Sequence, residues 1–318
     1  MNPDDFSYNI DGNKVPTETL LYGADGDVMI EFSKFAYRIY DEGNYVYVSI
    51  SNDAETIAKD PKFSYLPFTR NELGDCEKIY IGAYLGRIDN GKLRSLQGPP
   101  TASQTIGQFR TAAQANGEGY EQYTFYQHTM LQCLYLIRYG NLNGQAALGK
   151  GYTEAEKADV AGVTFDNGMY FGNPEDGTTH VKFAGIEDFY GNLGQLIDGI
   201  YCSDTYHAMA ATTGFNDIAS GYTDLGAICV EDVSGIIETI WGDTALGFIP
   251  KTYVTEEETT ENSLEENYSD LAEVFAGRMA VAGAAFDSGA YGGPFFLSLG
   301  VPAGDAEPLV GARLSFYK

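Results

Sequence analysis

The sequence predicts an α+β fold in which short strands and long glycine-rich loops surround two main helices. Three observations lead to this prediction. Glycine is frequent, at 38 of 318 residues, and such a number serves turns, bulges and left-handed backbone positions. Segments near both ends of the chain alternate as half-buried strands do, whereas the middle changes to helical spacing. Hydrophobic residues make up 44% of the chain, which supplies a packed core and excludes a disordered chain.

The chain divides into three predicted segments. Residues 1–26 are polar with weak periodicity and are expected to form an N-terminal arm or attachment segment. Residues 27–104 are expected to form a β-rich subdomain, and residues 105–318 a larger domain. Strands of the subdomain are expected within Val28–Tyr40, Tyr45–Ser51 and Lys78–Asp89, the first two joined as a hairpin.

Two helices are predicted in the middle of the chain. The first runs from Thr105 to a stop at Asn116-Gly117. The second spans Gly119 to Tyr139, and we interpret His128 within it as a hydrogen-bonded core residue because no Ser, Cys or carboxylate motif accompanies it. Its apolar stripe is expected to hold Tyr123, Tyr126, Met130, Leu134 and Ile137.

The remainder of the larger domain is expected to consist of loops and short strands. A short helix is predicted over Asn192–Asp198, and two or three closing strands between Val281 and Phe316. The stretch Thr252–Asp270 holds seven acidic residues and no basic one, which predicts an exposed acidic loop.

Charge and cysteine content exclude several classes of function. The formal net charge is −26, so the chain repels nucleic acid and anionic membranes. No basic and apolar leader opens the sequence and no window approaches 18 apolar residues, so we expect synthesis in the cytoplasm and no membrane insertion. Four widely spaced cysteines have no metal-ligand spacing and are interpreted as reduced core thiols: Cys76, Cys133, Cys202 and Cys229.

Several segments, in this order along the chain, resemble one family of phage tail-fibre and receptor-binding proteins. The block Phe109–Gly151 resembles the family's helical block, and Lys182–Ile200 resembles its Gly-Ile-Glu, Gly-Asn and Asp-Gly-Ile hallmark. The C-terminal stretch GGPFFLSLGVPAGDAEPLVGARLSF resembles the family's last third. Further matching segments are Asp27–Ile39, Tyr80–Gly98, Gly247–Pro250 and Tyr268–Asp270.

This resemblance implies a C-type-lectin-like fold, similar to that of the variable proteins of diversity-generating retroelements, and a role in displaying a ligand-binding surface. The exposed ligand-binding candidates that it implies are Asp287, Ser288, Tyr291, Asp305 and Glu307. The structural frame that it implies consists of Gly185, Gly191, Asn192, Asp198, Gly199, Gly292, Gly293, Gly311 and Arg313.

Two departures from the family pattern concern the core and the variable turns. The helix after Gly191-Asn192 usually carries tryptophans, whereas this chain has Leu193 to Leu196 there. The turn region after Val281 is usually rich in Asn and Ser, whereas this chain has AGAAFDSGAYGG. The second departure weakens the case that this copy is diversified.

The implied setting is the surface of a bacteriophage particle assembled in the host cytoplasm. Expected partners are a bacterial surface glycan or protein, other virion proteins reached through the arm or a docked face, and further copies of the chain, with a trimer as the first guess. No nucleic acid partner, no catalytic residues, no cofactor and no metal are expected.

Four alternatives stand beside this interpretation. The strongest is a structural virion protein with no host ligand, because a shared fold does not carry function with it. A polysaccharide-degrading enzyme is a second alternative, but its pair of catalytic carboxylates cannot be identified from sequence in a chain with 45 acidic residues. A relative of formylglycine-generating enzymes would need a C-terminal cysteine pair, and no cysteine follows Cys229. A calcium-dependent lectin would need a Glu-Pro-Asn or Gln-Pro-Asp triplet, which is absent, so calcium remains only a minor alternative.

Overall fold

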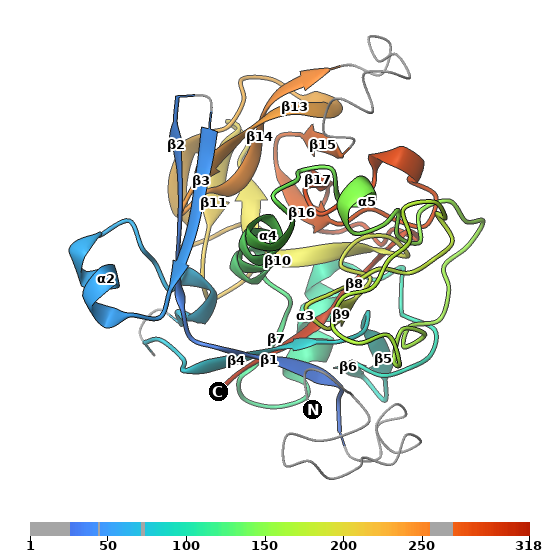
Figure 1. The fold of residues 1–318 in the computed structure, drawn as a ribbon. Coiled ribbons are helices and arrows are strands. Elements are labelled where there is room, and N and C mark those ends of the chain that lie inside the picture. Colours follow the sequence, from blue (N-terminus) through green and yellow to red (C-terminus); the bar gives the residue numbers. More distant parts are fainter. Residues whose placement is uncertain (1–25, 44, 71–73, 255–269) are drawn as a thin grey trace.

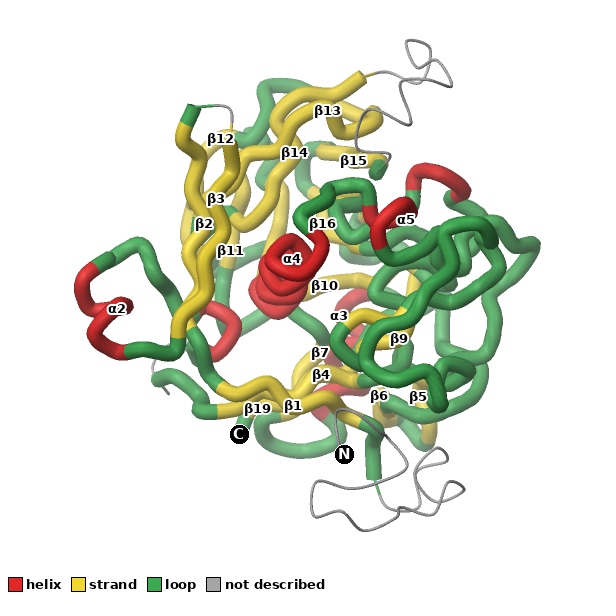
Figure 2. The backbone as a smooth tube through the Cα atoms, in the orientation of Figure 1, coloured by secondary structure: helices red, strands yellow, loops and turns green. Residues whose placement is uncertain are grey.

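The computed structural model describes residues 26–43, 45–70, 74–254 and 270–318. The described part is mostly β with few helices, in agreement with the broad α+β prediction. Two sheets lie on different sides of a central helix, as Figures 1 and 2 show. The helices are α2 (Ala54–Lys59), α3 (Ile106–Gln114), α4 (Phe125–Tyr139) and α5 (Gly144–Ala147), with short 3₁₀ turns η1 (Leu66–Phe68) and η4 (Gly289–Tyr291).

The larger sheet has 11 strands. Nine follow one another in space as β12 (Thr223–Ala227), β11 (His207–Ala210), β10 (Gly194–Cys202), β16 (Arg278–Ala282), β17 (Leu297–Val301), β15 (Leu271–Val274), β13 (Val233–Asp243), β2 (Ala36–Glu42) and β3 (Tyr45–Ser51). The other two are β14 (Gly247–Val254), which pairs with β13, and β18 (Val310–Gly311), which pairs with β10.

The smaller sheet has four strands, in the order β1 (Met29–Ser33), β4 (Lys78–Gly82), β19 (Leu314–Tyr317) and β7 (Tyr120–Gln122). Strand β4 is therefore hydrogen-bonded on one side to β1, the first described strand, and on the other side to β19, the last one. Strands of residues 27–104 share both sheets with strands of residues 105–318. Two further two-stranded ladders are β5 (Arg87–Asp89) with β6 (Lys92–Arg94) and β8 (Lys182–Phe183) with β9 (Ile186–Glu187).

The predicted N-terminal hairpin is confirmed only for the second half of Val28–Tyr40, which forms β2 and pairs with β3. The first half forms β1, which belongs to the smaller sheet. The register of β2 and β3 runs without interruption from the pair Ala36 and Ser51 to the pair Glu42 and Tyr45. The predicted strand Lys78–Asp89 is divided into β4 and β5. The predicted closing strands are confirmed as β17, β18 and β19.

The first predicted helix is confirmed as α3. Thr105 forms a capping box, in which its hydroxyl accepts the Gln108 N–H and the Gln108 side chain accepts the Thr105 N–H. This arrangement satisfies donors that the first turn of a helix leaves free.

The second predicted helix begins later than expected, at Phe125 instead of Gly119. Tyr120–Gln122 are drawn into β7, where they pair with β19. The helix starts where Thr124 and Gln127 form a second capping box. The predicted apolar stripe is wrong at its end, because Ile137 is 49% exposed whereas the first part of α4 is buried on almost every side.

The predicted helix over Asn192–Asp198 is wrong, because residues 194–202 form strand β10. This strand lies inside the larger sheet between β11 and β16 and is buried on both faces. Its sequence GQLIDGIYC shows no alternation of apolar and polar residues, because the polar side chains of Gln195 and Asp198 are also buried, in bonds to Arg313 and Arg110. The pattern alone therefore did not indicate a strand.

The predicted acidic loop, Thr252–Asp270, is wrong at both of its ends. Thr252–Val254 end β14, and Asp270 is fully buried instead of exposed. The Asp270 carboxylate accepts the Phe295 N–H at 2.6 Å, which places it in the core. Residues 255–269, like the predicted arm up to residue 25, lie outside the described residues.

The four cysteines are free thiols, as predicted. Cys133 and Cys202 are buried in the core, whereas Cys76 and Cys229 are only half-buried at its edge. No helix of the described residues is long and apolar enough to cross a membrane.

Candidate functional site

The five predicted ligand-binding residues lie on two loops near the C-terminus. Asp287, Asp305 and Glu307 are exposed, whereas Ser288, which precedes η4, and Tyr291, its last residue, are half-buried. The Ser288 hydroxyl accepts the Ala285 N–H at 3.0 Å, so this side chain stabilises its own turn. The three acidic side chains are therefore the members of the predicted set that are open to a ligand.

One buried turn holds both loops by backbone hydrogen bonds. The N–H of Gly191 donates to Gly283 O at 2.8 Å, and Asn192 O accepts the N–H of Phe286 at 3.0 Å. Two residues further on, the N–H of Gly194 donates to Leu309 O at 3.0 Å. Residues 283–292 and 302–309, which we call the display loops, are thus fixed to the same turn, residues 191–194.

The conformation of this turn explains its residue types. Gly191 and Asn192 have φ angles of 84° and 66°, a left-handed region that favours Gly and then Asn. A side chain at Gly191 would collide with the Tyr152 backbone, whose carbonyl accepts the Asn192 N–H at 2.8 Å. The turn therefore needs a glycine followed by a residue that tolerates positive φ.

A buried polar network fixes the Asn192 side chain. Asn192 Nδ2 donates to Asp188 Oδ2 at 2.9 Å, and Asn192 Oδ1 accepts the Asp159 N–H at 2.9 Å. The other Asp188 oxygen lies 2.7 Å from His180 Nδ1. The second ring nitrogen, His180 Nε2, lies 3.3 Å from the half-exposed Asp159 carboxylate. We call Asp159, His180, Asp188 and Asn192 the polar network.

The charge state of His180 follows from its neighbours. Burial by itself would lower the pKa of His180, but the negative charge and hydrogen bond of Asp188, with further help from Glu187 and Asp159, outweigh burial and raise the pKa to about 9. His180 is therefore an imidazolium at neutral pH. Tyr152 stacks on the ring with a centroid distance of 4.6 Å, which covers one face of the cation.

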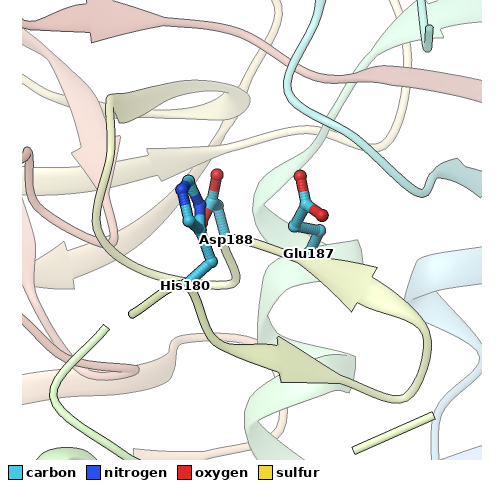
Figure 3. Close-up of side chains that lie close together, drawn as sticks. All are labelled: His180, Glu187 and Asp188. Carbon is cyan, nitrogen blue, oxygen red and sulfur yellow. The ribbon is translucent and has the colours of Figure 1, made fainter. Parts of the chain in front are cut away.

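Two members of the polar network, His180 and Asp188, together with the neighbouring Glu187 have the residue types of a metal site. Figure 3 shows His180 beside Asp188, with Glu187 next to them, and one ligand atom of each lies within 4.8 Å of the others. Hydrogen bonds to protein groups engage both oxygens of each carboxylate. Glu187 accepts the Gly162 N–H at 2.5 Å through one oxygen, and the Thr164 N–H at 2.7 Å and hydroxyl at 2.6 Å through the other. These contacts account for the burial of the group as a hydrogen-bonded cluster, so it carries no assignment of a metal.

Arg313, a predicted frame residue, connects the polar network to the smaller sheet. Its guanidinium is fully buried and donates to Gln195 Oε1 at 2.7 Å, Gly82 O at 2.9 Å, Glu187 O at 2.7 Å and Asp188 O at 3.0 Å. Burial lowers the pKa of Arg313 to about 10, which leaves the side chain charged at neutral pH. Arg313 thus ties β19, β4 and β10 to the backbone that carries Asp188.

The other predicted frame residues occupy buried positions. Asp198 forms a bidentate ion pair with Arg110, at 2.7 Å and 3.0 Å, which joins α3 to β10. Gly293 lies against the Asp270 carboxylate, where a side chain would overlap both carboxylate oxygens. The remaining members are Gly185 and Gly199, which have positive φ, and Gly292 and Gly311, which have neighbours close to the place of a Cβ atom.

His128 is the buried, hydrogen-bonded core residue that the sequence predicts. Its Nδ1 lies 3.2 Å from the Tyr123 hydroxyl. Burial lowers the pKa of His128 to about 3, so the ring is neutral.

Sequence reasoning missed the members of the polar network other than Asn192, and also Tyr152. Asp159, His180 and Asp188 are separated by loop residues of no recognisable period, and long loops hide which side chains meet. The spacing of His180 and Asp188 was the only available signal, and a histidine with a carboxylate eight residues away is too common to predict a contact.

Comparison with known proteins adds no family to these observations. No protein-family model matches the chain, and no curated protein matches it.

Proposed function

We propose that this chain is a bacteriophage surface protein with a C-type-lectin-like fold, which binds a bacterial surface ligand without catalysis through its display loops. The observation that carries the proposal is the attachment of both display loops to the single turn 191–194. The family resemblance described above supplies the biological setting, in which the protein is assembled in the host cytoplasm and displayed on the particle.

A rigid base under exposed polar side chains is what a binding surface needs. Loops carry most binding residues, and affinity is gained when their backbone is fixed before the ligand arrives. Here Asp287, Asp305 and Glu307 lie on loops whose backbones are hydrogen-bonded to a buried turn. Within that turn, the Asn192 side chain is bonded to Asp188, which is also bonded to the His180 cation. Three carboxylates suit a ligand that offers cations or hydroxyl donors, such as a glycan or a basic protein surface.

The arrangement of elements supports the proposed fold family. Two main helices, α3 and α4, lie beside antiparallel ladders, and no helix or strand interrupts residues 148–181. Two main helices and long irregular segments are what the resemblance implies for a C-type-lectin-like domain. The larger sheet departs from the small antiparallel sheets that it implies, because it has 11 strands and includes the parallel pairs β10–β18 and β15–β17.

Binding of the purified, fluorescently labelled protein to a panel of bacterial strains tests the proposal. We expect saturable binding to a few strains and a loss of about tenfold or more when Asp287, Asp305 and Glu307 are replaced together by Ala. Glu118→Ala is the matched control, because Glu118 is an exposed acid in the turn before β7, away from the display loops. Thermal melting of each variant establishes that folding is retained.

Three results would contradict the proposal in different ways. Saturable binding that the triple variant keeps would move the site away from the display loops. Binding to none of the strains would favour a structural virion protein without a host ligand. Release of reducing sugar from the bound cells would favour a polysaccharide-degrading enzyme.

A further inference from the structure

We propose that this chain pairs with a second copy of itself along the outer edge of β3, so that the larger sheets of two copies join across a two-fold axis. Strand β3 (Tyr45–Ser51) is the last strand in the order of the larger sheet. Figures 1 and 2 show the β2–β3 hairpin on the outside of the molecule. This inference is independent of the display loops.

The register of the hairpin shows which backbone groups of β3 are open. On β2, the N–H and C=O of Tyr37 bond to Ser64, and those of Ile39 bond to the Thr244 hydroxyl. These residues therefore direct their backbone groups away from β3. Because backbone direction alternates along an antiparallel pair, their partners across the hairpin direct theirs away from β2. The register identifies these partners as Ile50 and Val48, and the same alternation adds Val46.

These open groups have no partner within the described part of the chain. No hydrogen bond of the described residues reaches the N–H or C=O of Val46, Val48 or Ile50. A row of such groups on an edge strand is a template for another strand, and soluble proteins normally block it with charges, proline, bulges or very short strands.

The other edges of the two sheets are blocked in these ways. Strand β12 carries Asp224 and a register irregularity, and β14 carries Pro250 followed by Lys251. Strand β1 carries Glu31, and the edge strands β7 and β18 are only three and two residues long. Strand β3 has the sequence YVYVSIS, with no charge and no proline, and its register is regular over all seven residues.

The residue pattern of β3 fits a second copy. An antiparallel pairing centred on Val48 places Val48 opposite the same residue of the second copy and Val46 opposite the second copy's Ile50. This register uses the three open residues on each strand and forms about six backbone hydrogen bonds. On the opposite face, Tyr47 meets the second copy's Ser49. Apolar residues thus meet apolar residues on one face, and no charged side chain of β3 meets another.

Pairing with a second copy would bury exposed apolar and aromatic side chains of β3. Tyr45 is 71% exposed, Tyr47 42%, Ile50 39% and Val46 37%. Tyr47 stacks on Tyr40 with a centroid distance of 5.0 Å and an interplanar angle of 11°, so part of this surface is already ordered. Little further freedom is lost when an ordered edge is covered.

The charge distribution selects a second copy as the occupant. Residues 27–104 carry 9 basic and 11 acidic residues, whereas residues 105–318 carry 9 basic and 29 acidic residues. Two copies of so acidic a chain repel each other over most of their surface. The uncharged edge strand lies in the one segment that is nearly neutral, so it is the place where two copies can approach. A charged partner would find no complementary charge on this strand.

Sedimentation velocity of the full chain over a range of micromolar concentrations tests the proposal. We expect a reversible dimer for the unmodified protein. The double variant Val46→Lys/Ile50→Lys should dimerise at least about tenfold more weakly, because the two positions face each other across the axis and like charges opposite each other destabilise a strand pair.

A second double variant, Val46→Lys/Ile50→Glu, tests the register itself. It changes the same two half-exposed positions but places opposite charges across the axis, so dimerisation should return to within about tenfold of the unmodified protein. Thr223→Lys, on the opposite edge strand β12, is the control and should leave the dimer unchanged. Circular dichroism and thermal melting confirm that each variant is folded.

Three outcomes would overturn the proposal. A monomer at every concentration would show that β3 does not pair with a second copy. An oligomer that the Lys/Lys variant leaves intact would place the contact on another surface. Equal weakening by the Lys/Lys and Lys/Glu variants would exclude the register centred on Val48.

Discussion

Replacement of Arg313 by Met removes the group that joins β19 to the base of the display loops. Met has a similar length and packs in an apolar space, so the change removes the hydrogen-bond donors and the charge but little volume. Three acceptors lose the partner that Arg313 supplies: the carbonyls of Gly82 and Glu187, and the side-chain oxygen of Gln195. The Asp188 carbonyl also loses a bond from Arg313 but keeps the one from Gln195 Nε2 at 3.0 Å.

The loss of stability follows from these three acceptors. A buried acceptor left without a partner costs about 1–3 kcal/mol. The lower end applies here, because removal of the guanidinium also removes the cost of burying a charge. We therefore expect a loss of about 3 kcal/mol in the free energy of unfolding. Arg313→Lys keeps the charge with fewer donors, so its loss should lie between zero and that of Arg313→Met.

Urea unfolding followed by far-ultraviolet circular dichroism measures this difference at pH 7. The two variants together separate the lost hydrogen bonds from the lost charge. If Arg313→Met unfolds at the same urea concentration as the unmodified protein, or at a higher one, the four hydrogen bonds contribute no net stability and the reasoning is refuted. The same result would remove the argument that Arg313 supports the base of the loops.

Two further predictions concern the core next to the display loops. Gly293→Ala should lower the free energy of unfolding by about 2–3 kcal/mol, because the new methyl group overlaps the buried Asp270 carboxylate. Gly304→Ala is the control and should change the free energy of unfolding little, because a Cβ atom there meets nothing within 4 Å. Equal urea midpoints for the two variants would contradict this prediction. The pKa of His180 is raised to about 9 from 6.5, so its stabilising contribution is complete below pH 6.5 and is lost as the pH rises through 9. His180→Gln should therefore be less stable than the unmodified protein by up to about 3 kcal/mol at pH 6, and the difference should shrink towards pH 10; a difference independent of pH would show that His180 acts through packing alone.

Local signals predicted the local elements of this fold. The hairpin of β2 and β3 follows from alternating residues on both sides of a polar turn, and α3 follows from its capping residue and its stop. The sequence also indicates the start of α4, since Thr124 and Gln127 have the spacing of a capping box. The helical spacing of the aromatic residues before them predicts an earlier start, which is wrong because Tyr120–Gln122 pair with β19.

Tertiary contacts decided the elements that the sequence did not predict. The run after Asn192 becomes strand β10 because strands from distant parts of the chain pair with both of its sides. Asp270 lies in an acidic stretch of the sequence, yet it is buried in the core, where its carboxylate accepts the Phe295 N–H. Of the five side chains predicted to be exposed, Asp287, Asp305 and Glu307 are exposed, whereas Ser288 and Tyr291 are half-buried. Nothing in the sequence indicated the turn that holds the two loops together.

The placement of β19 between β4 and β7 determines when the smaller sheet can form. Among the described residues, 314–317 form the strand that joins β4 to β7, and these two strands lie about 230 and about 190 positions before it along the chain. During synthesis, the edges of β4 and β7 that bind β19 must therefore stay unpaired until almost all of the described chain has left the ribosome. The protein should fold slowly and late, and a cell that makes many copies at once would have to keep these unpaired edges from binding one another.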